Sequence, residues 1–271
     1  MERSRIDVTE AIEGFPDFQV RWLARTTSTQ DVVRRAARAG AAEGYCCVAG
    51  EQTAGRGRQG RRWEAPPGSA LLVSVLLRPT TEAVSGVPIA AGLATVDALD
   101  ACCSVRAQLK WPNDVIAGGG KLAGILAEVE PAGSVAGSVA VVLGLGFNLT
   151  VAEFPPGVAG VSLHQLTPTP PDRGDLLRAW LRALAGRMRM LSERGIAGLR
   201  DDWRIHAVGL GEALTATGPH GDVTGIATDI DDTGALLVRT GDGIVRVVAG
   251  DVHLTTPATA PAPSQNPSRE R

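Results

Sequence analysis

The sequence predicts an α+β protein in which a mixed β-sheet flanked by helices is followed by a small β-barrel of the SH3-like kind. Helical and strand-like segments share most of the chain without strict β-α-β-α alternation, which favours an α+β sheet over a doubly wound fold. After residue 207 only short β-type runs separated by turn clusters remain. We therefore expect a first domain at 1–207, a second at 208–256 and a disordered Pro/Ala/Ser-rich tail at 257–271.

The composition is that of an ordinary globular protein. The chain has 271 residues, of which 44% are hydrophobic and 21% charged, so it can bury a sizeable core. The 27 basic and 29 acidic residues give a net charge of −2, whereas a dedicated nucleic-acid binder usually carries a basic excess. No apolar run approaches the roughly 18 residues that span a bilayer, and the N-terminus lacks a signal-peptide core. We expect a cytoplasmic protein without a DNA or membrane partner.

The first elements follow from local patterns. Residues 18–23 form a short strand, and the next segment is a helix. Ser28 or Thr29 is a good N-cap for this helix, Asp31 lies three positions after Ser28, and Gly40 is a natural stop. We therefore expect a capped helix directly after the first strand.

A glycine- and arginine-rich segment separates two apolar strands. Residues 44–50 and 70–77 are apolar runs of strand length, whereas residues 51–68 contain little that predicts regular structure. Residues 85–103 are a largely apolar helix with Pro88 in its first turn.

Four short strands and the clearest helix of the chain come next. The expected strands lie at 105–109, 115–117, 122–129 and 135–144. In residues 172–194, apolar residues recur at three- and four-residue intervals, which predicts an amphipathic helix, and a shorter helix at 196–206 follows. The five β runs of the second domain are 214–217, 223–229, 235–239, 244–249 and 252–254.

The cysteines form two adjacent pairs, Cys46–Cys47 and Cys102–Cys103. Both pairs lie among apolar residues, and neither has the C-x-x-C spacing of a zinc site. We expect reduced thiols that pack as small hydrophobic side chains.

The strongest local motif is the run Gly55-Arg56-Gly57-Arg58-Gln59-Gly60-Arg61-Arg62-Trp63. Glycine lets the backbone approach a ligand, and arginine offers bidentate donors for phosphate or carboxylate. Such a loop suits a ligand that carries several negative charges. A solvated charge run and an Arg/Gly-type RNA contact are the alternatives.

A second motif contains the only two lysines of the chain. Lys110 begins the run Lys110-Trp111-Pro112-Asn113-Asp114, and Lys121 follows three glycines and opens an apolar strand. Asn113 and Asp114 can contact a nucleotide or its metal, and the Lys121 ammonium can reach a ligand beside an unobstructed backbone. A surface lysine in a hairpin turn is the alternative.

Two further motifs are weaker alone. Residues 27–30, Thr-Ser-Thr-Gln, lie at an expected helix N-terminus, where free N–H groups and hydroxyls can receive a polar ligand head, although plain N-capping is the alternative. Residues 144–148, Gly-Leu-Gly-Phe-Asn, end an expected strand and offer the amide of Asn148.

Taken in order, these motifs resemble those of the biotin protein ligase family. That family shows Ser-Thr-Asn, Gln-x-x-Gly-Arg-Gly-Arg-x-Gly-Arg-x-Trp, Lys-Trp-Pro-Asn-Asp, Gly-Lys-Leu-x-Gly-Ile-Leu and Gly-x-Gly-x-Asn. The matching segments here are 28–30, 52–63, 110–114, 121–126 and 144–148. The resemblance covers about residues 20–255 and departs at one position, where Gln30 stands in place of Asn. It implies a catalytic domain like that of the class II synthetases.

The resemblance implies an enzyme that makes biotinyl-5′-AMP from biotin and Mg·ATP and moves the biotinyl group to a lysine of a biotin carboxyl carrier domain. The implied catalytic residues are Lys121, Arg58 and Arg56. The implied biotin-binding residues are Ser28, Thr29, Gln30, Gln52, Gly55, Arg56, Gly57, Arg58, Lys121 and Gly124. The implied ATP and adenylate contacts are Arg56, Arg58, Arg61, Trp63, Lys110, Asn113, Asp114 and Asn148. Asp114 is also the candidate contact to magnesium.

Many relatives carry an N-terminal DNA-binding domain. Because only about 20 residues precede the first strand here, we expect a monofunctional ligase. We also expect a monomer or weak homodimer. A lipoate or octanoate ligase is the nearest alternative, because it shares the catalytic fold. The polar start at 28–30 and the double-Arg loop argue against it. An RNA-binding module is the alternative from another class.

Overall fold

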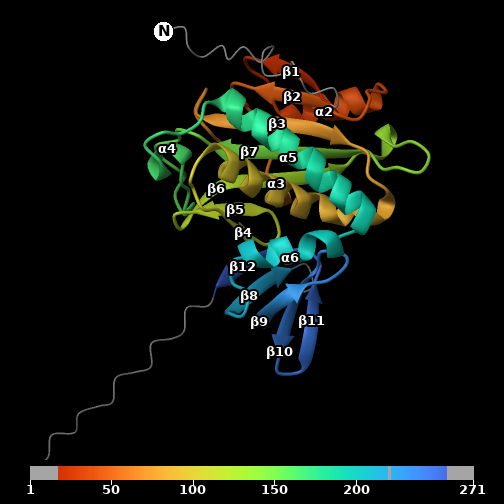
Figure 1. Cartoon of the computed structure of the whole chain (residues 1–271), viewed down its shortest axis with the longest axis vertical. Helices are drawn as coiled ribbons and strands as arrows, with labels where there is room; N and C mark the ends of the chain where they lie inside the picture. Colours follow the sequence, from red (N-terminus) through yellow and green to blue (C-terminus); the bar gives the residue numbers. More distant parts are fainter. Residues whose placement is uncertain (1–17, 219–220, 255–271) are drawn as a thin grey trace, which may run out of the picture.

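The computed structural model describes residues 18–218 and 221–254, and it contains two β-sheets with helices packed around them (Figure 1). The strands are β1 Gln19–Leu23, β2 Tyr45–Ala49, β3 Ala70–Leu77, β4 Gln108–Lys110, β5 Asp114–Ala117, β6 Gly120–Val129, β7 Val141–Asn148, β8 Ala213–Gly218, β9 Gly221–Ile230, β10 Leu236–Thr240, β11 Gly243–Val247 and β12 Asp251–Leu254. The helices are α2 Thr29–Arg38, α3 Val87–Cys102, α4 Leu163–Leu166, α5 Arg173–Arg194 and α6 Ala197–His206. The short 3₁₀ turns are η1 Arg58–Gly60, η2 Thr81–Gly86 and η3 Pro131–Gly133. The tail expected at 257–271 lies outside the described residues.

The larger sheet is mixed, as predicted. Its seven strands run in the order β1-β2-β3-β7-β6-β5-β4. The pair β1–β2 is parallel, and every other neighbouring pair is antiparallel. Helices α3 and α5 lie across this sheet, and the C-terminal strands lie beyond β4 at the far end of the molecule (Figure 1).

The two faces of the larger sheet have different roles. Alternate residues of a strand point to opposite faces. The odd-numbered residues of β3 and β7 join the main core with α3 and α5. Leu76 and Val142, on the opposite face, pack with residues of α2. On this second face β7 also presents Gly144 and Gly146, so the sheet surface beside α2 is left shallow.

Helix α3 is the centre of the core. Together with η2 it forms a helical segment of 22 residues, with a mean hydropathy of 1.3 over an 18-residue window. Although the sequence shows no uninterrupted apolar run of this length, the segment is long and apolar enough to cross a membrane. However, 72% of the window is buried inside the protein, as expected for the core helix of a globular domain.

One arginine joins three helices. The guanidinium of Arg187 in α5 donates to both carboxylate oxygens of Asp97 in α3, at 2.7 and 2.8 Å, and also to Asp202 in α6. These hydrogen bonds raise the pKa of Arg187 above its ordinary value. Because the Arg187 side chain is only 14% exposed, this fork fixes the relative positions of α3, α5 and α6.

The C-terminal strands form an antiparallel sheet in the order β11-β10-β9-β8-β12. All five predicted β runs are present. In the described part of the chain, the end strands β11 and β12 are not hydrogen-bonded to each other. The strands of the expected SH3-like barrel therefore form an open sheet with two edge strands. Trp111 Nε1 donates to Gly234 O at 3.0 Å, and Arg204 of α6 pairs with Asp229, so this sheet is tied to the larger one.

The strand expected at 135–144 is wrong in its bounds. Strand β7 begins at Val141 and continues to Asn148. Residues 135–138 instead form a turn around Gly137, whose φ of +81° lies in the left-handed region. The glycines of β7 weaken its local strand propensity, but pairing with β3 on one side and β6 on the other extends the strand through them.

The four cysteines are unpaired thiols, as expected. Cys46 and Cys47 are buried in β2, and burial raises the pKa of Cys47 to about 11. Cys102 and Cys103 at the end of α3 are only half-buried, so the expectation of full packing holds for the first pair alone.

Asp231 closes the turn before β10. One of its carboxylate oxygens accepts from Thr233 N at 2.8 Å, Thr233 Oγ1 at 2.7 Å and Ala235 N at 3.1 Å, and the other pairs with Arg246. Burial raises the pKa of Asp231, but these hydrogen bonds outweigh it and lower the pKa from 3.8 to about 2. The ionised carboxylate therefore stabilises the folded state.

We expect Asp231→Asn to lower the free energy of unfolding at pH 7 by about 1–2 kcal/mol, because the amide loses the ion pair and part of the turn. The stabilisation by Asp231 is complete above its unfolded pKa of 3.8 and is lost as the pH falls through about 2. Urea unfolding should therefore show a difference between wild type and variant that shrinks from pH 5 to pH 2. Asp242→Asn, on the exposed β10–β11 turn, is the control. A difference that persists at pH 2 would contradict this role.

Candidate active site

A cavity of about 1020 Å³ lies on the α2 face of the larger sheet, where that sheet meets the C-terminal strands. It collects nearly all the residues that the sequence motifs single out. Those lining it are Ser28, Thr29, Gln30, Gln52, Arg56, Gly57, Arg58, Arg61, Trp63, Lys110, Asn113, Asp114, Lys121, Gly124 and Asn148. Segments far apart in the sequence therefore share one hollow.

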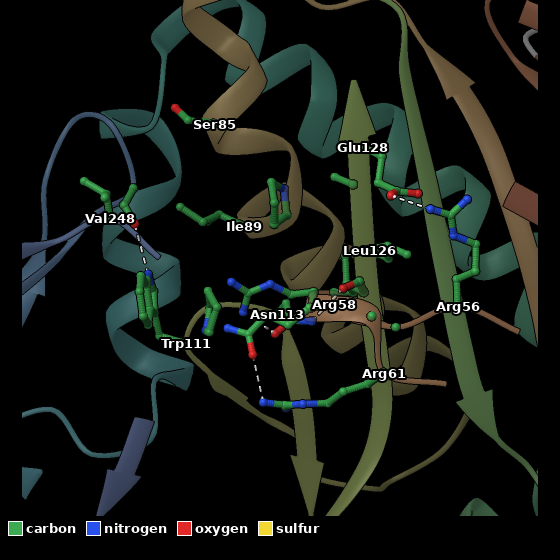
Figure 2. A pocket seen from close by; sticks show the side chains of 18 of the residues that line it. Arg56, Arg58, Arg61, Ser85, Ile89, Trp111, Asn113, Leu126, Glu128 and Val248 are labelled. Atoms are coloured by element: carbon green, nitrogen blue, oxygen red, sulfur yellow. Dashed lines mark hydrogen bonds and ion pairs between the residues drawn. The ribbon is translucent and has the colours of Figure 1, made fainter. Parts of the chain in front are cut away.

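Gly55 is the exception. It lines an adjoining cavity of about 650 Å³ on the other side of the arginine loop, shown in Figure 2. A Cβ at position 55 would lie 2.3 Å from Trp63 O, so glycine is required there for the close approach of two backbone segments. The absence of a Cβ at Gly55 therefore lets the loop fold back on itself; the predicted contact of Gly55 with biotin stays a prediction.

The larger cavity is electropositive. Its lining includes six Arg and Lys side chains and three Asp and Glu side chains. The cations are Arg56, Arg58, Arg61, Arg62, Lys110 and Lys121. This excess of positive charge fits a polyanionic ligand such as a nucleoside triphosphate.

The start of α2 carries buried hydroxyls. Thr29 is internally satisfied, since Gln52 Oε1 accepts from its N at 2.7 Å and its Oγ1 lies 2.8 Å from Ser74 Oγ. Ser28 is the N-cap of α2, as predicted, but its side chain makes no capping hydrogen bond. The Oγ of Ser28 is buried without a partner, and the residue lines the cavity.

The side chain of Gln30 in α2 has room above the sheet because the residue that faces it on β7 is Gly144. Its Nε2 donates to Leu126 O at 2.9 Å, and a Cβ at Gly144 would lie 3.0 Å from that nitrogen. Its Oε1 is buried without a partner. The longer side chain therefore spans to β6 and presents an unsatisfied acceptor beside Ser28.

Trp63 lies flat on the glycines of the sheet. A Cβ at Gly146 would be 2.4 Å from its indole ring, and one at Gly124 would be 2.8 Å from it. The Lys121 Nζ lies 5.6 Å from the centroid of this ring and 2.6 Å from Asp114 Oδ1. The predicted lysine, acid and aromatic thus form one cluster, and the indole Nε1 is buried without a partner.

The two central arginines of the loop have different partners. Arg56 pairs with Glu128 at 3.1 Å (Figure 2) and also with Asp31 at 3.0 Å, so two carboxylates neutralise it. Arg58 donates instead to two neutral oxygens, Asn113 Oδ1 and Gly250 O, each at 3.2 Å. Burial lowers the pKa of Arg58, and it has no carboxylate directly bonded to it. Arg58 therefore lines the cavity with neutral hydrogen-bond partners, whereas Arg56 is paired with carboxylates.

The two asparagines mainly support other groups. Asn113 Nδ2 donates to Ile125 O at 2.7 Å while its oxygen accepts from Arg58. Asn148 Nδ2 donates to Lys121 O and Val161 O, each at 3.2 Å, and the residue is 4% exposed. Both side chains hold the backbone or the cations that line the cavity.

The C-terminal sheet adds residues that the motifs did not indicate. Asp251, Val252, His253 and Leu254 of β12 line the same cavity, as does Phe154 from the loop after β7. These residues lie in short segments without a local pattern. The pairing of β12 with β8 brings the four β12 residues to the cavity.

Comparison with known proteins agrees with this geometry. Residues 22–148 match the Biotin/lipoate A/B protein ligase family, and residues 209–254 match the Biotin protein ligase C terminal domain. The biotin–[acetyl-CoA-carboxylase] ligase of Mycobacterium tuberculosis is 39% identical over 238 residues, which are 85% of this chain and 86% of that protein. The enzyme of the same name from Paracoccus denitrificans is 37% identical over 239 residues and is covered to 98%.

A similar solved structure is the biotin protein ligase from Aquifex aeolicus in complex with biotin and ATP. It has a TM-score of 0.75 and 27% identity, and the match covers 88% of this chain and 98% of that one. The sequence matches, the fold and the single cavity that joins the motifs agree: the chain belongs to the biotin protein ligase family.

Proposed function

We propose that this chain activates biotin as biotinyl-5′-AMP and transfers the biotinyl group to a lysine of a biotin carboxyl carrier domain. The observation that carries the proposal is that one cavity joins buried, unpartnered polar atoms at the start of α2 to the cations Arg58 and Lys121. This arrangement suits a substrate with a polar ring at one end and a carboxylate at the other. The names of the similar ligases support the same substrate.

In the proposed complex the ureido ring of biotin lies at Ser28 and Gln30. The Ser28 hydroxyl can donate to the ureido oxygen, and Gln30 Oε1 can accept from a ureido N–H. Gln52 is held by Thr29 at the edge of this subsite. The apolar part of biotin would run along the sheet surface beside Trp63 and Gly124.

The first step forms a bond between a carboxylate oxygen of biotin and the α-phosphorus of ATP. The bond from that phosphorus to the bridging oxygen breaks, and pyrophosphate leaves with the oxygen. Negative charge accumulates between two anions in the transition state, and Lys121 and Arg58 are the cations in position to stabilise it. Arg56 stays a proposed catalytic contact: it pairs with two carboxylates, as Lys121 pairs with Asp114, and these pairs also hold the loop.

Magnesium enters as part of the substrate Mg·ATP. The described residues contain no group of three or more His, Cys, Asp or Glu side chains that could hold a metal by themselves. Mg²⁺ commonly binds one or two carboxylates together with substrate phosphates. Asp114, beside Lys121, is the carboxylate we propose for this contact.

In the second step the acceptor lysine attacks the carbonyl carbon of the adenylate. Its nitrogen forms the new amide bond, the amine loses a proton and AMP leaves. No enzyme nucleophile is needed. Trp63 covers the glycine surface of the sheet, and we assign it to shielding the adenylate from water.

The four free cysteines suit a reducing compartment, so we retain the prediction of a cytoplasmic protein. We also retain the prediction of a monomer or weak homodimer without a DNA or membrane partner.

The direct test is incubation with biotin, Mg·ATP and a carrier domain, followed by intact mass measurement of the carrier. We expect a mass gain of one biotinyl group that requires both substrates. A carrier whose acceptor lysine is replaced by arginine is the control. Absence of any gain with a folded carrier would overturn the proposed function.

Ligand selectivity separates the biotin ligase from a lipoate ligase. Because a lipoyl chain has no ureido ring, it leaves Ser28 Oγ and Gln30 Oε1 unpaired. We expect biotin to raise the melting temperature and lipoate at the same concentration to leave it nearly unchanged. Stabilisation by lipoate alone would favour the alternative enzyme.

We expect Lys121→Ala to slow pyrophosphate release by about 10²- to 10³-fold, because a cation at the developing charge is lost. The fold should persist, since Lys121 lines the cavity and is not part of the hydrophobic core. Lys121→Arg, which keeps the charge in another geometry, is the matched variant and should retain part of the rate. Near-normal release by the alanine variant would exclude this role for Lys121.

A further inference from the structure

We propose that Asp251 of the C-terminal sheet is a positioning residue, which through its ion pair with Arg61 and the neighbouring Gly250–Arg58 contact holds the arginine loop over the nucleotide end of the cavity. The inference rests on the proposed function. It assigns the C-terminal sheet a part in binding ATP through one named contact.

The contact point on the sheet is rigid. Asp251 begins β12 and is paired with Thr217 of β8. Gly250 before it has a φ of +153°, and a Cβ there would lie 2.2 Å from Thr217 O. Because only glycine fits this approach, the Gly250 carbonyl and the Asp251 carboxylate are presented from a fixed backbone.

The loop is held at both ends by different parts of the fold. At its start, Arg56 is bound by Asp31 of α2 and Glu128 of β6. At its end, Arg61 pairs with Asp251, and between them Arg58 donates to Gly250 O. Arg58 therefore stands between an anchor on the first sheet and an anchor on the second.

Arg61 has one partner within the loop, Gln59 Oε1 at 3.0 Å, and one outside it, the Asp251 carboxylate. Its side chain is 62% exposed, whereas that of Asp251 is 27% exposed and faces the cavity. A long exposed side chain without a partner samples many rotamers, and fixing it on the ligand then costs entropy. The pair with Asp251 fixes Arg61 before the nucleotide binds.

The direction in which ATP affinity changes distinguishes a positioning role of Asp251 from a purely electrostatic effect of its carboxylate. Removing a carboxylate from a phosphate-binding cavity should strengthen ATP binding if only the Coulomb attraction mattered. If Asp251 positions Arg61 and the loop, its removal should weaken ATP binding. The two accounts make opposite predictions for the same variant.

The experiment measures pyrophosphate release by the full chain, first with ATP varied at saturating biotin and then with biotin varied at saturating ATP. We expect Asp251→Asn to raise the KM for ATP about fivefold, the upper range for a partly exposed pair, with kcat and the KM for biotin within about twofold of wild type. Arg61→Ala should give a similar rise, and the double variant should be no worse than either single variant. Asp251→Glu should restore most of the affinity, and Asp242→Asn on the same sheet should behave as wild type.

An unchanged or lowered KM for ATP in Asp251→Asn, with an unchanged melting temperature, would overturn the positioning role. Additive losses in the double variant would show that Asp251 and Arg61 act separately, which would also overturn it. Failure of the wild-type chain to release pyrophosphate from biotin and ATP would instead overturn the proposed function, so the two failures are distinguishable.

Discussion

The site depends on how the fold holds several guanidinium groups close together without a bound anion. Arg56, Arg58 and Arg61 lie within six positions of one loop, and their mutual repulsion would spread an unsupported loop into solvent. Carboxylates from α2 and β6 hold the first arginine, and a carboxylate from β12 holds the last. The middle arginine is left with neutral acceptors. This distribution of partners concentrates the unneutralised positive charge at Arg58, on the side of Lys121.

The sheet supplies the second constraint, which is room for the substrate. β7 places Leu143 and Leu145 toward the main core and glycines toward α2, so one strand is a packed core element and an open floor at once. Gln30 and the Trp63 ring occupy the space that side chains at Gly144 and Gly146 would fill. The same alternation that builds the core therefore also sets the depth of the cavity.

Sequence patterns predicted the elements whose information is local. The stripe of α5, the apolar run of β3 and the five β runs of the second sheet were confirmed, because periodicity and turn residues lie within one segment. The bounds of β7 were wrong because its glycines oppose strand formation and only pairing with β3 and β6 extends the strand. The motif residues, with the exception of Gly55, meet in one cavity as predicted. Asp251 and His253 had no motif to indicate them, since β12 reaches the cavity only through its pairing with β8.

The arrangement of partners also decides which kind of ligand the cavity favours. An RNA-binding loop would present all its arginines to solvent along a surface, whereas here Arg56 is paired with two carboxylates and Arg58 lies beside Asn113 in the cavity. A purely acyl substrate would leave the buried oxygens of Ser28 and Gln30 without partners, at a cost of about 1–3 kcal/mol each. A ligand that is polar at one end, apolar in the middle and anionic at the other satisfies both ends at once. Biotin has this order of groups, and its carboxylate end is the one that must meet the α-phosphate of ATP.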